Sequence, residues 1–267
     1  MDLKLNGRRA LVTGSSSGIG VTIASMLAAE GAKVVVHGRD AARAGRVTDG
    51  IAIAGGTVAT ALGDLATTEG FAAVVDGAVA AFGGIDILVN NAGVSSTSHD
   101  SWFDIEPDRW LEMYTGNTLP AIRLAQALVP GMRDRGWGRV IQISSRNAIS
   151  PYPQFADYGA AKAALNNVTL GLAKALAGTG VTSNGIMPGM IHTPMLDPWF
   201  EQLARKQGAD DPAVGQAYAI EHVLRQTVGR LGAPEDIAAA VCFVASPLAD
   251  FMSGTTFRID GGATPTV

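Results

Sequence analysis

The chain has 267 residues, a formal net charge of −4 and 16% charged residues, so it offers no broad basic surface for a nucleic acid backbone, and we expect no nucleic acid partner. The first residues, MDLKLNGRR, lack the apolar core of a signal peptide, and no apolar stretch approaches the ~20 residues that cross a bilayer. We therefore expect a soluble, cytoplasmic protein that makes no membrane contact.

Short runs rich in β-branched and aliphatic residues recur along the chain and predict seven strands, at 9–13, 33–37, 57–61, 86–90, 139–144, 181–187 and 255–260. Longer segments with helical spacing lie between them, at 19–30, 41–54, 67–82, 107–135, 155–177 and 234–245. The strands are too apolar for a sheet with one solvated face. We expect an α/β fold of the Rossmann type: a doubly wound, seven-stranded, mostly parallel sheet with helices on both faces.

The segment 190–230 interrupts this alternation. It contains no strand pattern but two helix-like pieces that are rich in charge, methionine and aromatic residues. Long excursions of this kind are often lids or binding loops, so we expect a substrate-binding lid inserted into a single domain that spans 1–267. The only cysteine, Cys242, lies in the apolar run IAAAVCFVA, where we expect a buried thiol without a chemical role.

The stretch TGSSSGIG at 13–20 joins the first predicted strand to the first predicted helix. This arrangement leaves free backbone N–H groups and the positive end of a helix facing a pyrophosphate. Gly14 permits the turn, Gly18 lets the backbone approach the phosphates, and Gly20 permits close packing of helix on strand. Taken by itself, the same stretch is also compatible with a tight turn that binds nothing.

The sequence YGAAK places Tyr158 and Lys162 on one face of a predicted helix, about one turn apart. A neighbouring ammonium favours the phenolate, so we expect a lowered pKa for Tyr158 and a role as general acid or base. Ser145 stands thirteen residues earlier at the end of a strand, where its hydroxyl can hydrogen-bond a carbonyl oxygen. The plainer alternatives are a Tyr and a Lys packed on an amphipathic helix, and a serine that caps a turn.

These motifs, in this order and spacing, resemble the short-chain dehydrogenase/reductase family over Asn6 to Gly262. The resemblance implies a catalytic set of Asn117, Ser145, Tyr158 and Lys162, in which Asn117 holds a water and Lys162 also hydrogen-bonds the nicotinamide ribose. It also implies the residues that bind the cofactor, which are Gly14, Ser16, Ser17, Gly18, Ile19, Gly20, Arg39, Asp64, Leu65, Asn91, Ala92, Gly93, Tyr158, Lys162, Pro188, Gly189, Ile191 and Thr193.

The choice between NAD and NADP depends on the end of the second strand, VVVHGRD. Gly38 stands where NAD-dependent members of the family usually carry Asp, and Arg39 follows it. A guanidinium offers a planar donor fork that suits the extra phosphate of NADP and no acceptor for a ribose diol. We therefore expect NADP(H). NAD(H) stays open as the alternative if Arg39 is only solvated and Asp40 turns towards the ribose.

By this resemblance we expect a hydride transfer between the nicotinamide and a carbonyl or secondary alcohol. Met190, Met195 and Trp199 suit a small, mainly apolar or cyclic substrate, unless they pack the lid onto the sheet. Arg146 either clamps a substrate anion, or it points away or pairs with an acid such as Asp157.

The alternatives to a carbonyl reductase are a nicotinamide-binding scaffold protein without turnover, an NAD-dependent alcohol dehydrogenase, and an epimerase or dehydratase. The histidines are scattered, so we expect no metal site. Apolar surface on the two long predicted helices, and the family resemblance, favour a homotetramer or homodimer.

Overall fold

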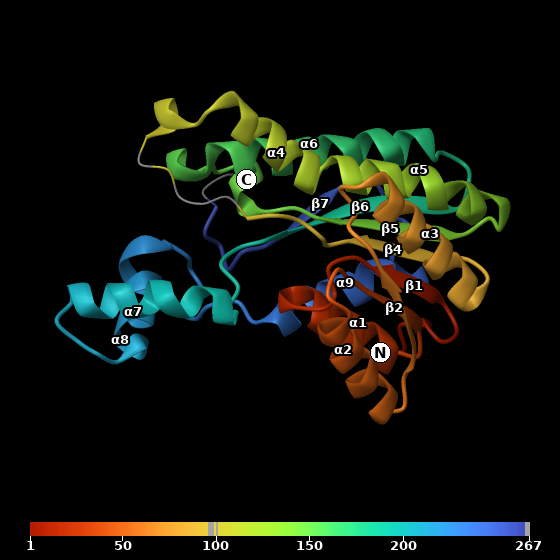
Figure 1. Ribbon diagram of the computed structural model, residues 1–267, viewed down its shortest axis with the longest axis horizontal. Helices are drawn as coiled ribbons and strands as arrows, with labels where there is room; N and C mark the ends of the chain where they lie inside the picture. The colour runs from red at the N-terminus through yellow and green to blue at the C-terminus, as the bar shows by residue number, and fades with distance from the viewer. Residues whose placement is uncertain (96–98, 100, 265–267) are drawn as a thin grey trace.

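The computed structural model describes residues 1–95, 99 and 101–264, and its seven strands form one parallel sheet in the order β3-β2-β1-β4-β5-β6-β7 (Figure 1). Every predicted strand is present, and each boundary lies within one residue of its expected position. The strands are β1 (Arg9–Val12), β2 (Lys33–Gly38), β3 (Thr57–Leu62), β4 (Ile87–Asn90), β5 (Gly138–Ile143), β6 (Val181–Pro188) and β7 (Thr256–Ile259).

Helices cover both faces of the sheet (Figure 1). Successive strand residues point to opposite faces, so Val12 packs into one core and Leu11 into the other. The first core lies under α1 (Gly18–Ala29), α2 (Ala41–Ile53) and α9 (Pro234–Ala245). The second core lies under α3 (Thr68–Phe82) and α5 (Leu119–Asp134), and the adjoining helices on this side are α4 (Pro107–Asn117) and α6 (Ala156–Ala175).

The prediction of one continuous helix over 107–135 is wrong, because the chain breaks between α4 and α5. Pro120 has no N–H to continue the helical ladder. The side chain of Asn117 donates to the Met113 carbonyl at 2.9 Å, and Thr118 Oγ1 donates to the Ala161 carbonyl in α6 at 2.9 Å. The first bond lies within the last turn of α4, and the second ties the residue after α4 to α6.

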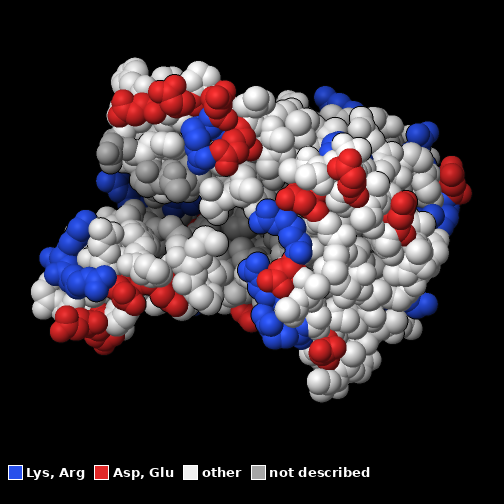
Figure 2. Space-filling model, in the orientation of Figure 1, with Lys and Arg blue, Asp and Glu red and all other residues white. Residues whose placement is uncertain are grey.

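The strand order reverses between β1 and β4, whose carboxyl ends therefore border a crevice in folds of this kind. The 190–230 segment projects beside this edge as α7 (Asp197–Lys206) and α8 (Pro212–Tyr218) (Figure 1). It has a small apolar cluster of its own, which includes Phe200, Leu203 and Leu224. Figure 2 shows the surface hollowed between this segment and the body of the molecule.

Candidate active site

A cleft of about 550 Å³ lies at the carboxyl ends of the strands and contains most of the predicted site. It brings the glycine-rich loop, the turns after β2, β3 and β4, and the residues around Tyr158 to one continuous surface. The predicted residues that line it are Gly14, Ser16, Ser17, Gly18, Ile19, Arg39, Asp64, Leu65, Asn91, Ala92, Gly93, Asn117, Ser145, Tyr158, Lys162, Pro188, Gly189, Met190, Ile191, Thr193 and Met195.

The glycine-rich loop has the backbone that its sequence predicts. Gly18 has a φ of 57° at the start of α1, and a β-carbon there would meet no atom within 4 Å, so the backbone is open to the cleft. A β-carbon on Gly20 would lie 2.5 Å from the Gly14 carbonyl oxygen. The absence of a side chain at Gly20 thus lets the helix pack against the turn, as expected.

The turn after β4 fastens this loop. The Asn91 side-chain amide donates to the carbonyls of Thr13 and Gly14, at 2.9 and 3.2 Å. The hydroxyl of Thr13 in turn accepts from the backbone N–H groups of Asn91 and Ala92, at 3.0 and 2.9 Å. The NNAG stretch therefore holds the glycine-rich loop in position in addition to lining the cleft.

Two arginines border the cleft near the end of β2. Arg39 is largely exposed, and its Nη1 lies 3.4 Å from Asp64 Oδ2. Arg43, which the sequence reasoning missed, lines the same region and pairs with Asp40 at 3.0 Å. Asp40 also accepts from the Arg43 backbone N–H as the cap of α2, and this bond holds its pKa below the ordinary value. Asp40 is therefore engaged at the helix start instead of facing a ribose.

Tyr158 and Ser145 lie together at the other end of the cleft. Burial raises the pKa of Tyr158, and its hydrogen bond with Ser145 lowers that pKa in part. The Lys162 Nζ donates to the Ile143 carbonyl at 2.9 Å and lies 5.6 Å from the centre of the Tyr158 ring. The expectation that this ammonium lowers the pKa of Tyr158 is thus wrong for the protein without ligand, in which burial dominates. Burial also lowers the pKa of Lys162 to about 8.

Asn117 is turned towards the same group. Its Nδ2 donates to the carbonyls of Val94 and Met113, at 3.1 and 2.9 Å, whereas its buried Oδ1 has no hydrogen-bond partner among the described residues. A β-carbon on Gly93 would lie 2.5 Å from Asn117 Oδ1 and 3.4 Å from Lys162 Nζ. The carbonyl oxygen and the ammonium therefore border one small space beside Gly93.

Two of the predicted substrate residues are not among the described residues that line the cleft. Arg146 donates to the Tyr152 hydroxyl at 2.6 Å and to the Leu224 carbonyl at 3.4 Å, so its predicted pairing with Asp157 is wrong. Trp199 packs on Phe200, with ring centres 5.2 Å apart, inside the 190–230 segment. Segment packing explains this aromatic residue, whereas Met190 and Met195 do border the cleft.

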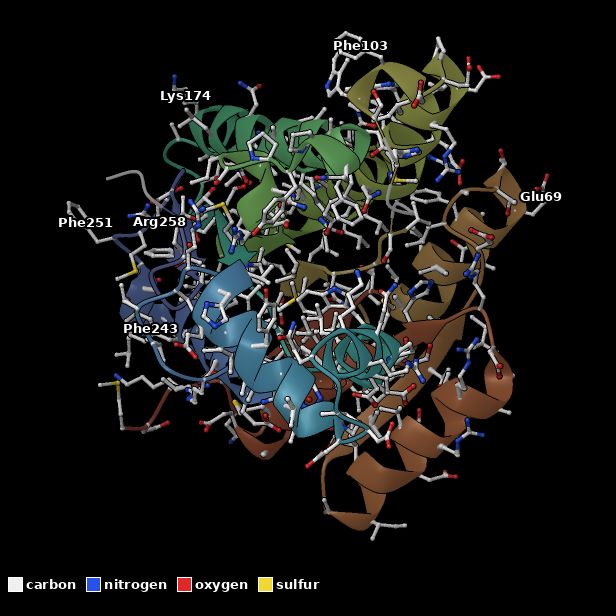
Figure 3. The ribbon with its side chains drawn as sticks, turned by 90° about the vertical axis from the view of Figure 1, so that its left-hand side faces the viewer. Glu69, Phe103, Lys174, Phe243, Phe251 and Arg258 are labelled. Atoms are coloured by element: carbon white, nitrogen blue, oxygen red, sulfur yellow. The ribbon has the colours of Figure 1, made fainter. Side chains whose placement is uncertain are left out.

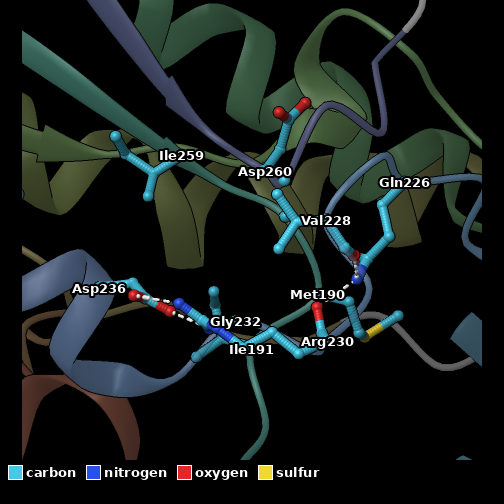
Figure 4. A pocket seen from close by; sticks show the side chains of 11 residues that line it. Met190, Ile191, Gln226, Val228, Arg230, Gly232, Asp236, Ile259 and Asp260 are labelled. Carbon is cyan, nitrogen blue, oxygen red and sulfur yellow. Dashed lines mark hydrogen bonds and ion pairs between the residues drawn. The ribbon is translucent and has the colours of Figure 1, made fainter.

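A second cavity, of about 250 Å³, lies beyond Met190 and Ile191 (Figure 4). Arg230 and Asp236 form a two-bond ion pair at its wall, at 2.6 and 2.8 Å. Gln226 donates to the carbonyls of Val228 and Arg230. These polar side chains are satisfied by one another and by nearby backbone, and we assign this cavity no ligand.

The described residues contain neither a membrane-spanning helix nor a cluster of metal-binding side chains. None of the helices in that part of the chain is long and apolar enough to cross a membrane. Within the same residues there is no group of three or more His, Cys, Asp or Glu side chains that could hold a metal ion. Cys242 is buried, and burial raises the pKa of its thiol to about 12, which keeps it protonated.

Comparison with known proteins gives one family. A family model described as short chain dehydrogenase matches residues 8–204. D-beta-hydroxybutyrate dehydrogenase of Cupriavidus necator is 34% identical over 258 residues, which cover 97% of this chain and 98% of the relative. 3beta-hydroxysteroid dehydrogenase 1 of Eggerthella lenta is 36% identical over 262 residues, with coverage of 97% and 95%.

The fold is also close to a solved structure. L-sorbose reductase from Gluconobacter frateurii, in complex with NADPH and L-sorbose, superposes with a TM-score of 0.93 at 34% identity, over 100% of both chains. The range matched by the family model includes both the glycine-rich loop and the helix that carries Tyr158 and Lys162. The chain belongs to the short-chain dehydrogenase family.

Proposed function

We propose that the protein is an NADP(H)-dependent oxidoreductase that transfers a hydride between the nicotinamide and a carbonyl or secondary alcohol. The observation that carries this proposal is the single cleft shared by the glycine-rich loop, Ser145, Tyr158 and Lys162. A scaffold protein without turnover has no need of this buried polar group, since burying such groups is unfavourable for folding.

The cofactor, when bound, supplies or accepts the hydride. Tyr158 gives its proton to the carbonyl oxygen of the substrate in reduction and takes it back in oxidation. Its raised pKa keeps the phenol protonated at neutral pH, which suits the reductive direction. Ser145, the hydrogen-bond partner of Tyr158, donates to the same oxygen as negative charge develops. Lys162 Nζ and Asn117 Oδ1 border the space beside Gly93, where Asn117 Oδ1 would hold a water through which Lys162 exchanges protons on the way to Tyr158.

NADP is supported by the residues at the end of β2. Gly38 leaves no carboxylate there for the ribose of NAD, and Asp40 is committed to capping α2. Arg39 and Arg43 present two guanidinium groups at the cleft, a donor geometry that suits a phosphate. The similar L-sorbose reductase was solved with NADPH.

The substrate end of the cleft supports a small, mainly apolar or cyclic compound. Val94, Met190, Met195 and Leu196 line it together with Thr193. Methionine side chains adapt to irregular apolar shapes. The similar proteins are named for a hydroxy acid, a steroid and a sugar, so their names do not select one substrate class. We therefore base the proposed substrate class on the residues that line the cleft. We further propose that the 190–230 segment, which contributes four of these residues, acts as the lid.

We also propose that the protein is a homo-oligomer, as a tetramer or a dimer. Large apolar side chains on α4, α5 and α6 are exposed, including Leu111, Leu119 and Leu170. Phe251, which precedes the edge strand β7 in the chain, is also fully exposed (Figure 3). Apolar surface of this kind is typical of protein interfaces.

The test is an assay of NADPH and NADH oxidation with ketones, aldehydes, quinones and keto acids. Tyr158→Phe should reduce turnover of the best substrate by ~100-fold or more while cofactor affinity changes little. Tyr114→Phe, which alters a tyrosine outside the cleft, serves as the matched control. Near-normal turnover by Tyr158→Phe would remove this residue from the mechanism, and the absence of cofactor binding by the wild type would defeat the proposed function.

A further inference from the structure

His37 is a buried histidine in β2 whose two ring nitrogens meet partners of fixed polarity. The backbone N–H of Gly14 donates to Nδ1 at 2.8 Å, and Nε2 lies 3.1 Å from the Gly63 carbonyl oxygen. A backbone N–H can only donate and a carbonyl can only accept. Both bonds therefore exist only when the ring is neutral and carries its proton on Nε2.

The backbone of His37 is tied to the same loop. Its N–H donates to Ser15 Oγ at 2.9 Å, and its carbonyl accepts from the Ser15 N–H at 2.9 Å. The buried Ser15 hydroxyl donates in turn to the Val12 carbonyl at 2.7 Å. The His37 ring thus joins the glycine-rich loop to the turn after β3, and it also lines the cleft.

The charged groups that act on the ring come from both neighbouring turns. Asp64, after β3, favours the protonated ring, whereas Arg39, after β2, opposes it. The other charges at the start of α2, on Asp40 and Arg43, pair with each other. Burial outweighs these contributions, so the pKa of His37 lies below its ordinary value.

We propose that His37 is a positioning residue for the cofactor loop, and that its neutral form is required for tight cofactor binding. A proton on Nδ1 replaces the acceptor of the Gly14 N–H with a second donor, so the loop must release this bond. The consequence is a cofactor affinity that falls in acid. This inference rests on the proposed function, because it assumes that the glycine-rich loop binds NADP. An imidazolium also attracts phosphate, and its effect on affinity has the opposite sign.

Calorimetric titration with NADP⁺ at a series of pH values distinguishes the two effects. His37→Asn carries an amide oxygen at the place of Nδ1 and keeps an acceptor for Gly14, but it does not titrate. His37→Gln carries its amide at the place of Nε2 and leaves Gly14 without that acceptor. His222→Asn, at an exposed histidine that is not among the residues lining the cleft, is the matched control.

We expect the ratio of wild-type Kd to His37→Asn Kd to rise as pH falls through the pKa of His37, which burial places below the ordinary value, and to approach a tenfold rise per pH unit once the ring is protonated. Titration of the cofactor is common to both proteins and cancels in this ratio. His37→Gln should bind more weakly than His37→Asn at every pH, and His222→Asn should follow the wild type. A ratio that stays flat or falls over the pH range in which nitrogen-15 NMR shows the His37 ring taking up its second proton would overturn the proposal. Failure of the wild type to bind NADP⁺ at any pH would instead defeat the proposed function.

A second measurement does not depend on any variant of His37 folding. Nitrogen-15 NMR of histidine-labelled wild-type protein reports which ring nitrogen of each histidine carries the proton. We expect His37 at neutral pH as the neutral form protonated on Nε2, with its signal identified by elimination from the single variants His99→Asn, His192→Asn and His222→Asn. A proton on Nδ1 at neutral pH contradicts the proposal.

Discussion

The hydroxyl of Ser16 fills the space beside Gly38 that a β-carbon would need. A β-carbon on Gly38 would lie 2.5 Å from Ser16 Oγ and 2.7 Å from Ser16 Cβ. An aspartate at this position is the residue that would hydrogen-bond the ribose diol of NAD. It cannot be introduced here unless the glycine-rich loop moves, so the choice of cofactor is linked to two positions that lie far apart in sequence.

Gly38→Asp alone should therefore weaken NADP binding without producing efficient use of NAD. The double change Gly38→Asp and Ser16→Gly removes the obstructing side chain and should gain NAD-dependent turnover. Apparent KM and kcat for both cofactors, measured for the two variants and for Ser16→Gly, test this expectation. Efficient NAD use by Gly38→Asp alone would show that the glycine-rich loop can move away from residue 38 at a small cost in free energy.

The two arginines at the cleft give a second prediction about the cofactor. Arg39→Ala and Arg43→Ala should each raise the Kd of NADP by about tenfold, the loss of one charge-assisted hydrogen bond, and change the Kd of NAD little. Arg46→Ala, on α2 but outside the lining of the cleft, is the matched control. Equal losses for NADP and NAD would place the arginines elsewhere than at the extra phosphate.

Lys162 is predicted to reduce the stability of the fold at neutral pH. Burial lowers its pKa from 10.5 to about 8, so between these values the folded protein has released a proton that the unfolded chain retains. Stability must then rise with pH across this window. Below about pH 8 the buried ammonium lowers the free energy of unfolding by up to ~3 kcal/mol. Its hydrogen bond to the Ile143 carbonyl, which contributes about 1 kcal/mol of stability, offsets part of this loss.

Lys162→Met should accordingly be inactive yet more stable than the wild type by about 1–3 kcal/mol near pH 7, with the difference shrinking towards pH 10. Urea unfolding at the two pH values measures this, and Lys174→Met, at an exposed lysine in the last turn of α6, is the control. A variant that is less stable at both values would mean that the ammonium is better solvated in the folded protein than its burial indicates.

The sheet could be predicted from the sequence because a buried strand is itself a short run of β-branched and aliphatic residues, so each strand can be identified from its own residues. The site was predicted less completely, since several of its interactions join residues that are distant in sequence. His37 and Arg43 looked like any polar residues beside a strand, and only the pairing of β2 with β1 brings the His37 ring to Gly14. Helical spacing correctly placed Lys162 near Tyr158, but it could not predict the bond from Lys162 on α6 to the Ile143 carbonyl on β5.

The exposed apolar residues give a prediction about assembly. If α4 and α6 form an interface, Leu111→Glu combined with Leu170→Glu should lower the mass of the assembly measured by light scattering. The charges would be desolvated between subunits, which is unfavourable without partners. Val79→Glu, an exposed apolar position on α3, is the control. A wild-type protein that is monomeric at micromolar concentration would contradict the proposed oligomer.

Gly93 gives the last prediction, because its missing side chain keeps open the space bordered by Asn117 and Lys162. Gly93→Ala would bring a methyl group to within 2.5 Å of Asn117 Oδ1, so Asn117 must turn away and its bonds to Val94 and Met113 must weaken. We expect kcat to fall by about tenfold or more, the usual weight of a proton-transfer step. Gly45→Ala on α2, where a β-carbon meets no atom within 4 Å, should leave kcat unchanged. Full activity in Gly93→Ala would show that proton transfer at Tyr158 does not depend on this space.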